Sequence, residues 1–267
     1  EAVAASLRKS FVISVSSKKP LGTFLFLGPT GVGKTETAKA ISAIFFTKST
    51  SLIRFDMALY QSTADISKLM GDSATKDPGL LTQAIRQQPY GVLLLDELEK
   101  ASPDLIDIFL TILDEGYFTS GAGDMVDCRH LIIIATSNAG ADYLAQNLQK
   151  NIVLTQSQVI DYLISRQIFK PEFLNRFDGV IVYSPLSQEA LLAIATIQLK
   201  ELSAMIKTKY NIDISISDNY KISLIQKGYD PRFGARNMKR TIQNTIEDTI
   251  AKAILSGEAK PGTKLAF

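Results

Sequence analysis

The sequence predicts an α/β protein with a parallel five-stranded sheet flanked by helices, followed by a small and mostly helical C-terminal domain. Two observations support this prediction. Short apolar runs alternate with segments whose apolar residues recur at helical spacing, which is typical of a buried parallel sheet. After residue 183 the alternation stops and helical spacing dominates. The runs that we expect to be buried strands are 24–27, 52–55, 92–95, 131–135 and 180–183.

Helical spacing between the strands predicts helices over 36–46, 79–87 and 104–113. Pro103 stands at the position where the first turn of a helix tolerates a proline. The stretch 141–166 is polar and compatible with helix. These helices would cover the faces of the sheet.

The C-terminal part begins after the Ser184-Pro185 pair, where we place a domain boundary. We expect a helix over 188–209, then a short strand in which isoleucines alternate over 212–216. A second helix would end near Gly228, and a third would begin around Gly234. The predicted domains are therefore an α/β domain over 1–183 and a small lid domain over 184–267.

Composition excludes several classes of function. The chain has 267 residues, of which 46% are hydrophobic, and a formal net charge of +2 with interspersed signs. This balance disfavours nucleic-acid binding, and a single cysteine, Cys128, and a single histidine, His130, are poor material for a transition-metal site. No apolar segment approaches the roughly 20 residues that cross a bilayer, so we expect no membrane contact. Our expectation for the location, which this absence does not establish, is cytoplasmic. Because the chain begins at Glu1, we expect a fragment of a longer protein.

A glycine-rich segment between the first predicted strand and helix carries the strongest chemical signal. Residues 28–35 fit the phosphate-binding pattern G-x-x-x-x-G-K-[ST] in its strand-to-helix context. Backbone N–H groups of such a loop converge on phosphates, the lysine adds a positive charge, and the hydroxyl is placed to ligate Mg²⁺. The sequence therefore predicts nucleoside triphosphate binding. The predicted binding residues here are Pro29, Thr30, Gly31, Val32, Gly33, Lys34, Thr35 and Glu36.

Two further predicted strands end in polar side chains. The run 93–95 leads into Asp96 and Glu97, which resembles a Walker B motif. Asp96 would join Thr35 in holding Mg²⁺, and Glu97 would act as general base toward the attacking water. The run 131–135 leads through a Thr-Ser pair to Asn138, which would orient that water or contact the γ-phosphate. A solvated acidic strand end and an ordinary turn are the alternatives at these two places.

Together these residues resemble the AAA+ ATPases of the P-loop NTPase class, and within them the Clp family, in particular the second ATPase module of ClpB-type chaperones. The resemblance spans nearly the whole chain. It implies an ATPase that uses ATP/ADP and Mg²⁺ and assembles as a homo-oligomeric, commonly hexameric, ring. The stretches that carry it are 24–39, 89–103, 136–140, 170–178 and 228–240.

The resemblance assigns roles to two arginines. In the segment 171–178, Arg176 resembles the arginine finger that reaches a neighbouring subunit's nucleotide, with a surface Arg176–Asp178 ion pair as the alternative. In the segment 228–236, Arg236 resembles the sensor 2 residue that contacts bound nucleotide. For Arg232 and Lys239 a solvated basic helix face is the preferred interpretation.

The chain departs from the family pattern at the loop that grips substrate. Relatives carry an aromatic loop between the second and third strands, whereas residues 69–80 are apparently shorter and contain no aromatic side chain. Two hypotheses follow. The first is an ATP-driven remodeller or disaggregase of protein substrates. The second is an ATP-dependent assembly or regulatory module that acts on a fixed protein partner without threading. A nucleotide-binding scaffold with negligible turnover is a third, disfavoured possibility. Because no Ile-Gly-Leu-like tripeptide lies between Asn138 and Phe169, we expect no compartmental protease partner.

Overall fold

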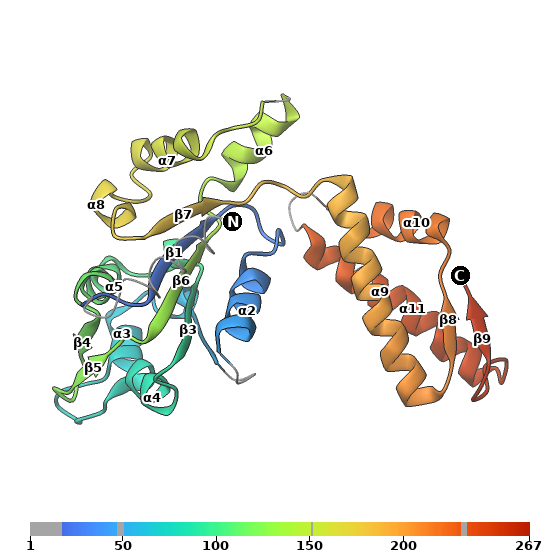
Figure 1. The fold of residues 1–267 in the computed structure, drawn as a ribbon, viewed down its shortest axis with the longest axis horizontal. Helices are drawn as coiled ribbons and strands as arrows, with labels where there is room; N and C mark the ends of the chain where they lie inside the picture. The colour runs from blue at the N-terminus through green and yellow to red at the C-terminus, as the bar shows by residue number, and fades with distance from the viewer. Residues whose placement is uncertain (1–17, 47–50, 151, 231–233) are drawn as a thin grey trace. The chain divides into compact units, whose positions relative to one another are not determined.

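The computed structural model describes residues 18–46, 51–150, 152–230 and 234–267. These residues divide into two compact units (Figure 1). The first unit contains residues 18–28 and 33–183. The second contains Ser184–Phe267, and the short segment Pro29–Val32 groups with it.

The first unit is built on a five-stranded sheet in the order β2-β3-β6-β1-β7, with every neighbouring pair parallel. The predicted α/β class and its five-stranded parallel sheet are confirmed. The register aligns Leu27 of β1 with Ser137 of β6 and with Val182 of β7, so the carboxyl ends of these strands meet at one edge. The strands are β1 (Gly22–Leu27), β2 (Leu52–Asp56), β3 (Gly91–Asp96), β6 (Leu131–Ser137) and β7 (Gly179–Val182).

Side chains from alternate positions of these strands enter two separate cores. On one face, Phe24, Leu94 and Ile132 pack against α2 (Lys34–Phe45). On the opposite face, Leu25 and its equivalents in the neighbouring strands form the larger core. Strands that are covered on both faces read as continuous apolar runs, which is why the sequence predicts them.

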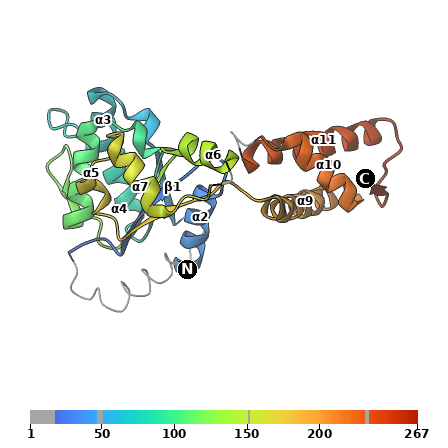
Figure 2. The same ribbon diagram turned by 90° about the horizontal axis from the view of Figure 1, so that it is seen from above.

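Several helices pack against the larger core, and Figure 2 labels α3, α4, α5, α6 and α7 among them. Helix α5 begins after Ser102, whose hydroxyl accepts the Leu105 N–H, and Pro103 occupies its first turn as predicted. Helix α7 has a capping box between Thr155 and Gln158. These elements are α3 (Thr63–Met70), α4 (Gly79–Gln87), α5 (Pro103–Glu115), α6 (Ala141–Gln149), α7 (Gln156–Ser165) and α8 (Pro171–Leu174), with short 3₁₀ turns η2 (Met57–Leu59) and η3 (Leu98–Lys100).

A hairpin that the sequence did not predict joins β4 (Tyr117–Thr119) to β5 (Met125–Asp127). Each strand has only 3 residues and buries one side chain, Phe118 or Val126. A segment this short gives no recognisable alternating pattern in the sequence. The hairpin braces the turn between α3 and α4, because the Gly121 N–H donates to the Met70 carbonyl at 2.8 Å.

The second unit contains the predicted helices and one strand pair. Helices α9 (Gln188–Tyr210), α10 (Asp218–Gly228) and α11 (Ala235–Leu255) surround a core of aliphatic side chains such as Leu199 and Ile246. Strand β8 (Asp213–Ser215) pairs in parallel with β9 (Lys264–Ala266), which the sequence did not predict. Arg232 lies outside the described residues. In the parts of the chain that are described, no helix is both long and apolar enough to cross a membrane.

Candidate functional site

The loop between β1 and α2 has a backbone that only glycine adopts easily. Gly28, Gly31 and Gly33 have φ values of 138°, 75° and 105°. A Cβ atom on Gly28 would lie 2.4 Å from the Tyr183 carbonyl oxygen, whereas one on Gly33 would meet nothing within 4 Å. One side of the loop is thus packed against the protein and the other is open. This is the form of a backbone cradle for an anion such as a phosphate group.

Lys34, at the start of α2, directs its ammonium group to the end of the sheet. Its side chain is only 7% exposed. Nζ donates to the Gly28 carbonyl at 2.5 Å and to Asn138 Oδ1 at 2.9 Å. Lys34 and Asn138, 104 positions apart in the chain, therefore meet at the carboxyl edge of β1 and β6.

Asp96 is the last residue of β3, and both of its carboxylate oxygens have partners. Oδ2 accepts from Arg54 Nη2 at 2.6 Å, and Oδ1 accepts from the Thr136 hydroxyl. Asp96 is 8% exposed. Together with the half-buried Thr35 hydroxyl, this carboxylate supplies the oxygen ligands that Mg²⁺ prefers, so the donor set fits the predicted ion.

Glu97 follows directly in a strained backbone conformation. Its φ and ψ are 57° and 49°, the left-handed region that a non-glycine residue enters only at a cost of about 1–3 kcal/mol. The Glu97 N–H donates to Thr136 Oγ1 at 3.3 Å, and Oε1 lies 3.5 Å from Asn138 Nδ2. Such strain concentrates at functional sites, where surrounding contacts hold it.

Asn138 joins these groups from the end of β6. Its amide oxygen accepts from Lys34, its amide nitrogen faces Glu97, and its backbone N–H donates to Glu99 Oε1 at 3.1 Å. The structure therefore brings together four of the predicted site residues: Lys34, Asp96, Glu97 and Asn138.

Arg176 lies elsewhere on the first unit, just after α8. Its guanidinium is exposed and pairs with Asp114 of α5, with Nη1 and Oδ1 3.0 Å apart. The alternative pair with Asp178 is not formed among the described residues. Instead, the Asp178 carboxylate accepts from the backbone N–H and the hydroxyl of Thr23 at 2.8 and 3.0 Å.

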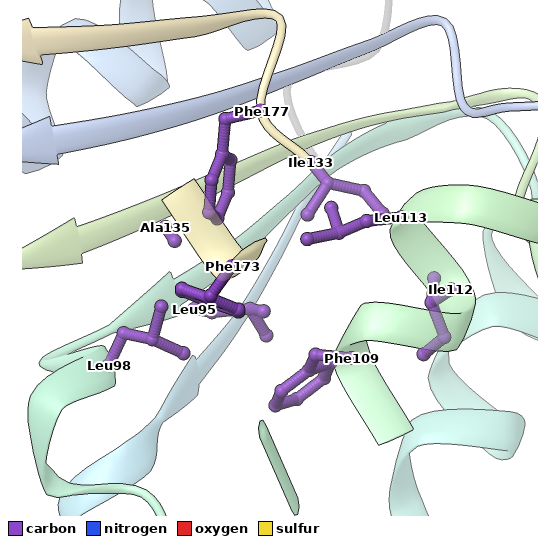
Figure 3. A pocket seen from close by; sticks show the side chains of 9 residues that line it. All are labelled: Leu95, Leu98, Phe109, Ile112, Leu113, Ile133, Ala135, Phe173 and Phe177. Atoms are coloured by element: carbon purple, nitrogen blue, oxygen red, sulfur yellow. The ribbon is translucent and has the colours of Figure 1, made fainter. Parts of the chain in front are cut away.

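Two phenylalanines that flank Arg176 in the sequence, Phe173 and Phe177, are buried in the larger core. Both are labelled in Figure 3. The rings of Phe173 and Phe177 meet edge to face with centroids 5.2 Å apart. The gap among the surrounding side chains is about 10 Å³, at the lower limit for one water molecule. This region is close-packed core rather than a ligand site. Its lining residues are Leu95, Leu98, Phe109, Ile112, Leu113, Ile133, Ala135, Phe173 and Phe177.

The other predicted residues are placed as follows. Pro29, Thr30 and Val32 lie in the glycine-rich loop, and the exposed Glu36 pairs with Lys39 at 2.7 Å. Arg236 is exposed in the first turn of α11, in the second unit, and its contact with nucleotide stays a prediction.

Sequence reasoning missed three residues that contact the site, namely Arg54, Glu99 and Thr136. Arg54 contacts Asp96, and Glu99 contacts Asn138. Thr136 contacts both Asp96 and Glu97. Each carried a weak signal. Arg54 is a charge inside an otherwise apolar strand, Glu99 follows the acidic pair by two residues, and Thr136 begins the polar end of β6. None of these signals indicates which residue is the partner.

The fold and the site define a AAA-type nucleotide-binding module, and comparison with known families agrees. Residues 19–180 match the AAA domain (Cdc48 subfamily), so the chain belongs to this family. Residues 186–267 match the C-terminal, D2-small domain of ClpB protein.

The chain is also similar to proteins named chaperone protein ClpB. It is 40% identical to that of Corynebacterium efficiens over 99% of this chain and 30% of the relative. It is 39% identical to those of Meiothermus ruber and Vibrio vulnificus, over 99% of this chain and 31% of each relative. The chain thus spans about a third of the length of these relatives, and the predicted resemblance to a ClpB C-terminal module is confirmed.

Proposed function

We propose that this chain binds ATP with Mg²⁺ and hydrolyses it to ADP and phosphate. The observation that carries the proposal is the convergence of Lys34, Glu97 and Asn138 beside a glycine cradle at one edge of the sheet. A cation can stabilise the phosphate charge, and a carboxylate and an amide can position the attacking water. Catalysis of phosphoryl transfer consists mainly of such positioning and charge stabilisation.

In this proposal the residues have distinct roles. The backbone of Pro29–Val32 and Gly33 binds the phosphates, and Lys34 Nζ neutralises their outer oxygens. Thr35 and Asp96 hold Mg²⁺, which supplies Lewis-acid stabilisation of phosphate charge. Glu97 Oε1 accepts the proton of the attacking water, and Asn138 Nδ2 orients that water.

We further propose that hydrolysis depends on assembly into a ring, with residues 1–183 as the nucleotide-binding domain and 184–267 as the lid. The Arg176 guanidinium is exposed, and its ion pair with Asp114 lies at the surface, so it is available to a neighbouring copy. A guanidinium from a neighbour would stabilise charge on the γ-phosphate, and Arg236 would link the lid to nucleotide occupancy.

The relatives' name supports a chaperone module that acts on protein substrates. It favours this over the fixed-partner alternative, and we propose no compartmental protease partner. The turn between α3 and α4 is the feature that stands against threading by the usual aromatic grip. It is closed by the two backbone bonds between Asp72 and Asp77, at 3.0 and 3.1 Å, and has no aromatic side chain.

ATP turnover per subunit, measured across a series of protein concentrations with Glu97→Gln as the control, tests the proposal. A specific rate that rises with concentration and is lost in the variant supports hydrolysis at subunit interfaces. A rate equal to that of the variant at every concentration would contradict it for this chain.

A further inference from the structure

Thr136 occupies an unusual position in the network, because one buried hydroxyl contacts two functional residues. The residue is 1% exposed near the end of β6. Its Oγ1 donates to Asp96 Oδ1 and accepts the Glu97 N–H at 3.3 Å. A hydroxyl has one proton and two lone pairs, so this arrangement uses the proton for the carboxylate and a lone pair for the amide.

The strand itself gives no reason for a hydroxyl here. Thr136 follows a continuous apolar run, and valine has the same shape and an equal or better strand preference. A buried hydroxyl without a hydrogen bond costs free energy, so most buried polar side chains form hydrogen bonds. The structure shows two hydrogen bonds of this hydroxyl, one to Asp96, the last residue of β3, and one to Glu97, which follows it.

The bond to Glu97 acts on the strained backbone. A left-handed conformation at a glutamate persists only where neighbouring contacts over-determine it. The Thr136 oxygen receives the N–H of this residue, and the Thr136 proton fixes the rotation of the Asp96 carboxylate next to it. The direction of the Glu97 side chain and the plane of Asp96 are therefore set by the same atom.

We infer that Thr136 is a positioning residue that fixes the placement of the magnesium-binding carboxylate and the general base relative to each other. The inference rests on the proposed ATPase function. Arg54 provides a matched contrast, since it contacts the other oxygen of Asp96, and within the described part of the chain it forms no hydrogen bond or ion pair with Glu97. Its side chain is 49% exposed, so its hold on Asp96 is looser.

Three variants test the inference: Thr136→Val, which removes the hydroxyl at constant shape, Thr136→Ser, which keeps it, and Arg54→Gln. We expect Thr136→Val to lower kcat about tenfold or more with KM changed less than about threefold, because small misplacements of catalytic groups act on the transition state. Thr136→Ser should recover kcat to within about threefold of the wild type. Arg54→Gln should change the Mg²⁺ concentration needed for half-maximal turnover by a larger factor than it changes kcat.

A second readout does not depend on turnover. Binding of ADP is measured by calorimetry with Mg²⁺ and in EDTA, on each chain. We expect Thr136→Val to bind ADP normally in EDTA but to lose part of the gain in affinity that Mg²⁺ gives, and Thr136→Ser to keep it. If Thr136→Val fails to fold, the inference stands on Thr136→Ser, whose loss of kcat or of the Mg²⁺ gain would overturn it.

The outcomes separate this inference from the proposed function. Wild-type kcat in a folded Thr136→Val chain, with turnover still lost in Glu97→Gln, overturns the role of Thr136 alone. A uniform loss of stability and of ADP binding in EDTA, not recovered by serine, also overturns it in favour of a purely structural role. If the wild type shows no Glu97-dependent turnover, the proposed function fails, and the Mg²⁺ effect on ADP affinity decides the role of Thr136.

Discussion

Replacing Phe177 by alanine removes the ring that anchors the Arg176 segment in the larger core. Phe177 is 9% exposed and packs edge to face on Phe173. Truncation of a buried phenylalanine costs roughly 3–5 kcal/mol, and loss of an aromatic pair is part of that cost. The tight packing around the ring leaves little room for collapse, so we expect the free energy of unfolding of the first unit to fall by about 4 kcal/mol.

The single cysteine of the chain supplies the assay. Cys128 is fully buried in the same core, and burial, with a smaller contribution from Asp127, raises its pKa to about 12. Only the thiolate reacts with thiol reagents, so labelling requires opening of the unit. Under conditions where reclosing is fast, the labelling rate follows the open population, and a 4 kcal/mol loss raises that rate about 10³-fold.

A urea series distinguishes opening of the whole unit from local fluctuation around Cys128, because only the former depends steeply on urea. Ile44→Ala, at a position that is 77% exposed on α2, is the control and should change the rate by less than about threefold. An increase below about fivefold for Phe177→Ala, with a steep urea dependence, would refute the packing argument.

Three other predictions concern single contacts. Gly28→Ala places a Cβ against the Tyr183 carbonyl at a φ of 138°, so thermal unfolding should show a loss of about 2 kcal/mol or more, and a tolerated alanine would contradict the close packing. Arg176→Ala should lower turnover about 10³-fold while equilibrium nucleotide affinity stays within a few-fold, and an equal loss in the control Arg129→Ala would argue against an interface role. The Arg129 guanidinium holds the pKa of Asp127 below its usual value near 3.8, so Asp127→Asn should be less stable than the wild type at neutral pH. That difference should shrink as pH falls below the normal aspartate range, as urea unfolding at several pH values would show, and a difference that persists in acid would contradict the ion-pair explanation.

Burial on both faces explains why the sheet could be predicted. Every residue of β1, β3 and β6 is buried because each face of the sheet is covered, and most of these residues form continuous apolar runs. These runs can be recognised in the sequence without any partner being known. The glycine-rich loop was predictable for a related reason. Its spacing follows from local backbone geometry, which Gly28 and Gly33 satisfy by themselves.

Contacts between distant segments could not be predicted in this way. The Thr136 hydroxyl meets Asp96 across 40 positions, and Arg176 pairs with Asp114 across 62 positions rather than with the nearby Asp178. Sequence spacing identifies groups that can form ion pairs or hydrogen bonds, but the register of β3 beside β6 decides which of them meet. The short hairpin escaped prediction because a strand with one buried residue has no periodicity.

The turn between α3 and α4 has a consequence for engineering. Three glycines meet there so closely that a Cβ atom on Gly71, Gly79 or Gly121 would lie 2.1–2.3 Å from neighbouring backbone. The tip formed by residues 73–76, in contrast, is exposed on every residue. The three glycines therefore cannot be replaced without a clash. The tip can accept insertions and substitutions that change its length and chemistry. An aromatic segment inserted there would supply the aromatic side chains that residues 69–80 lack, while leaving the sheet and the proposed site at its carboxyl edge unchanged.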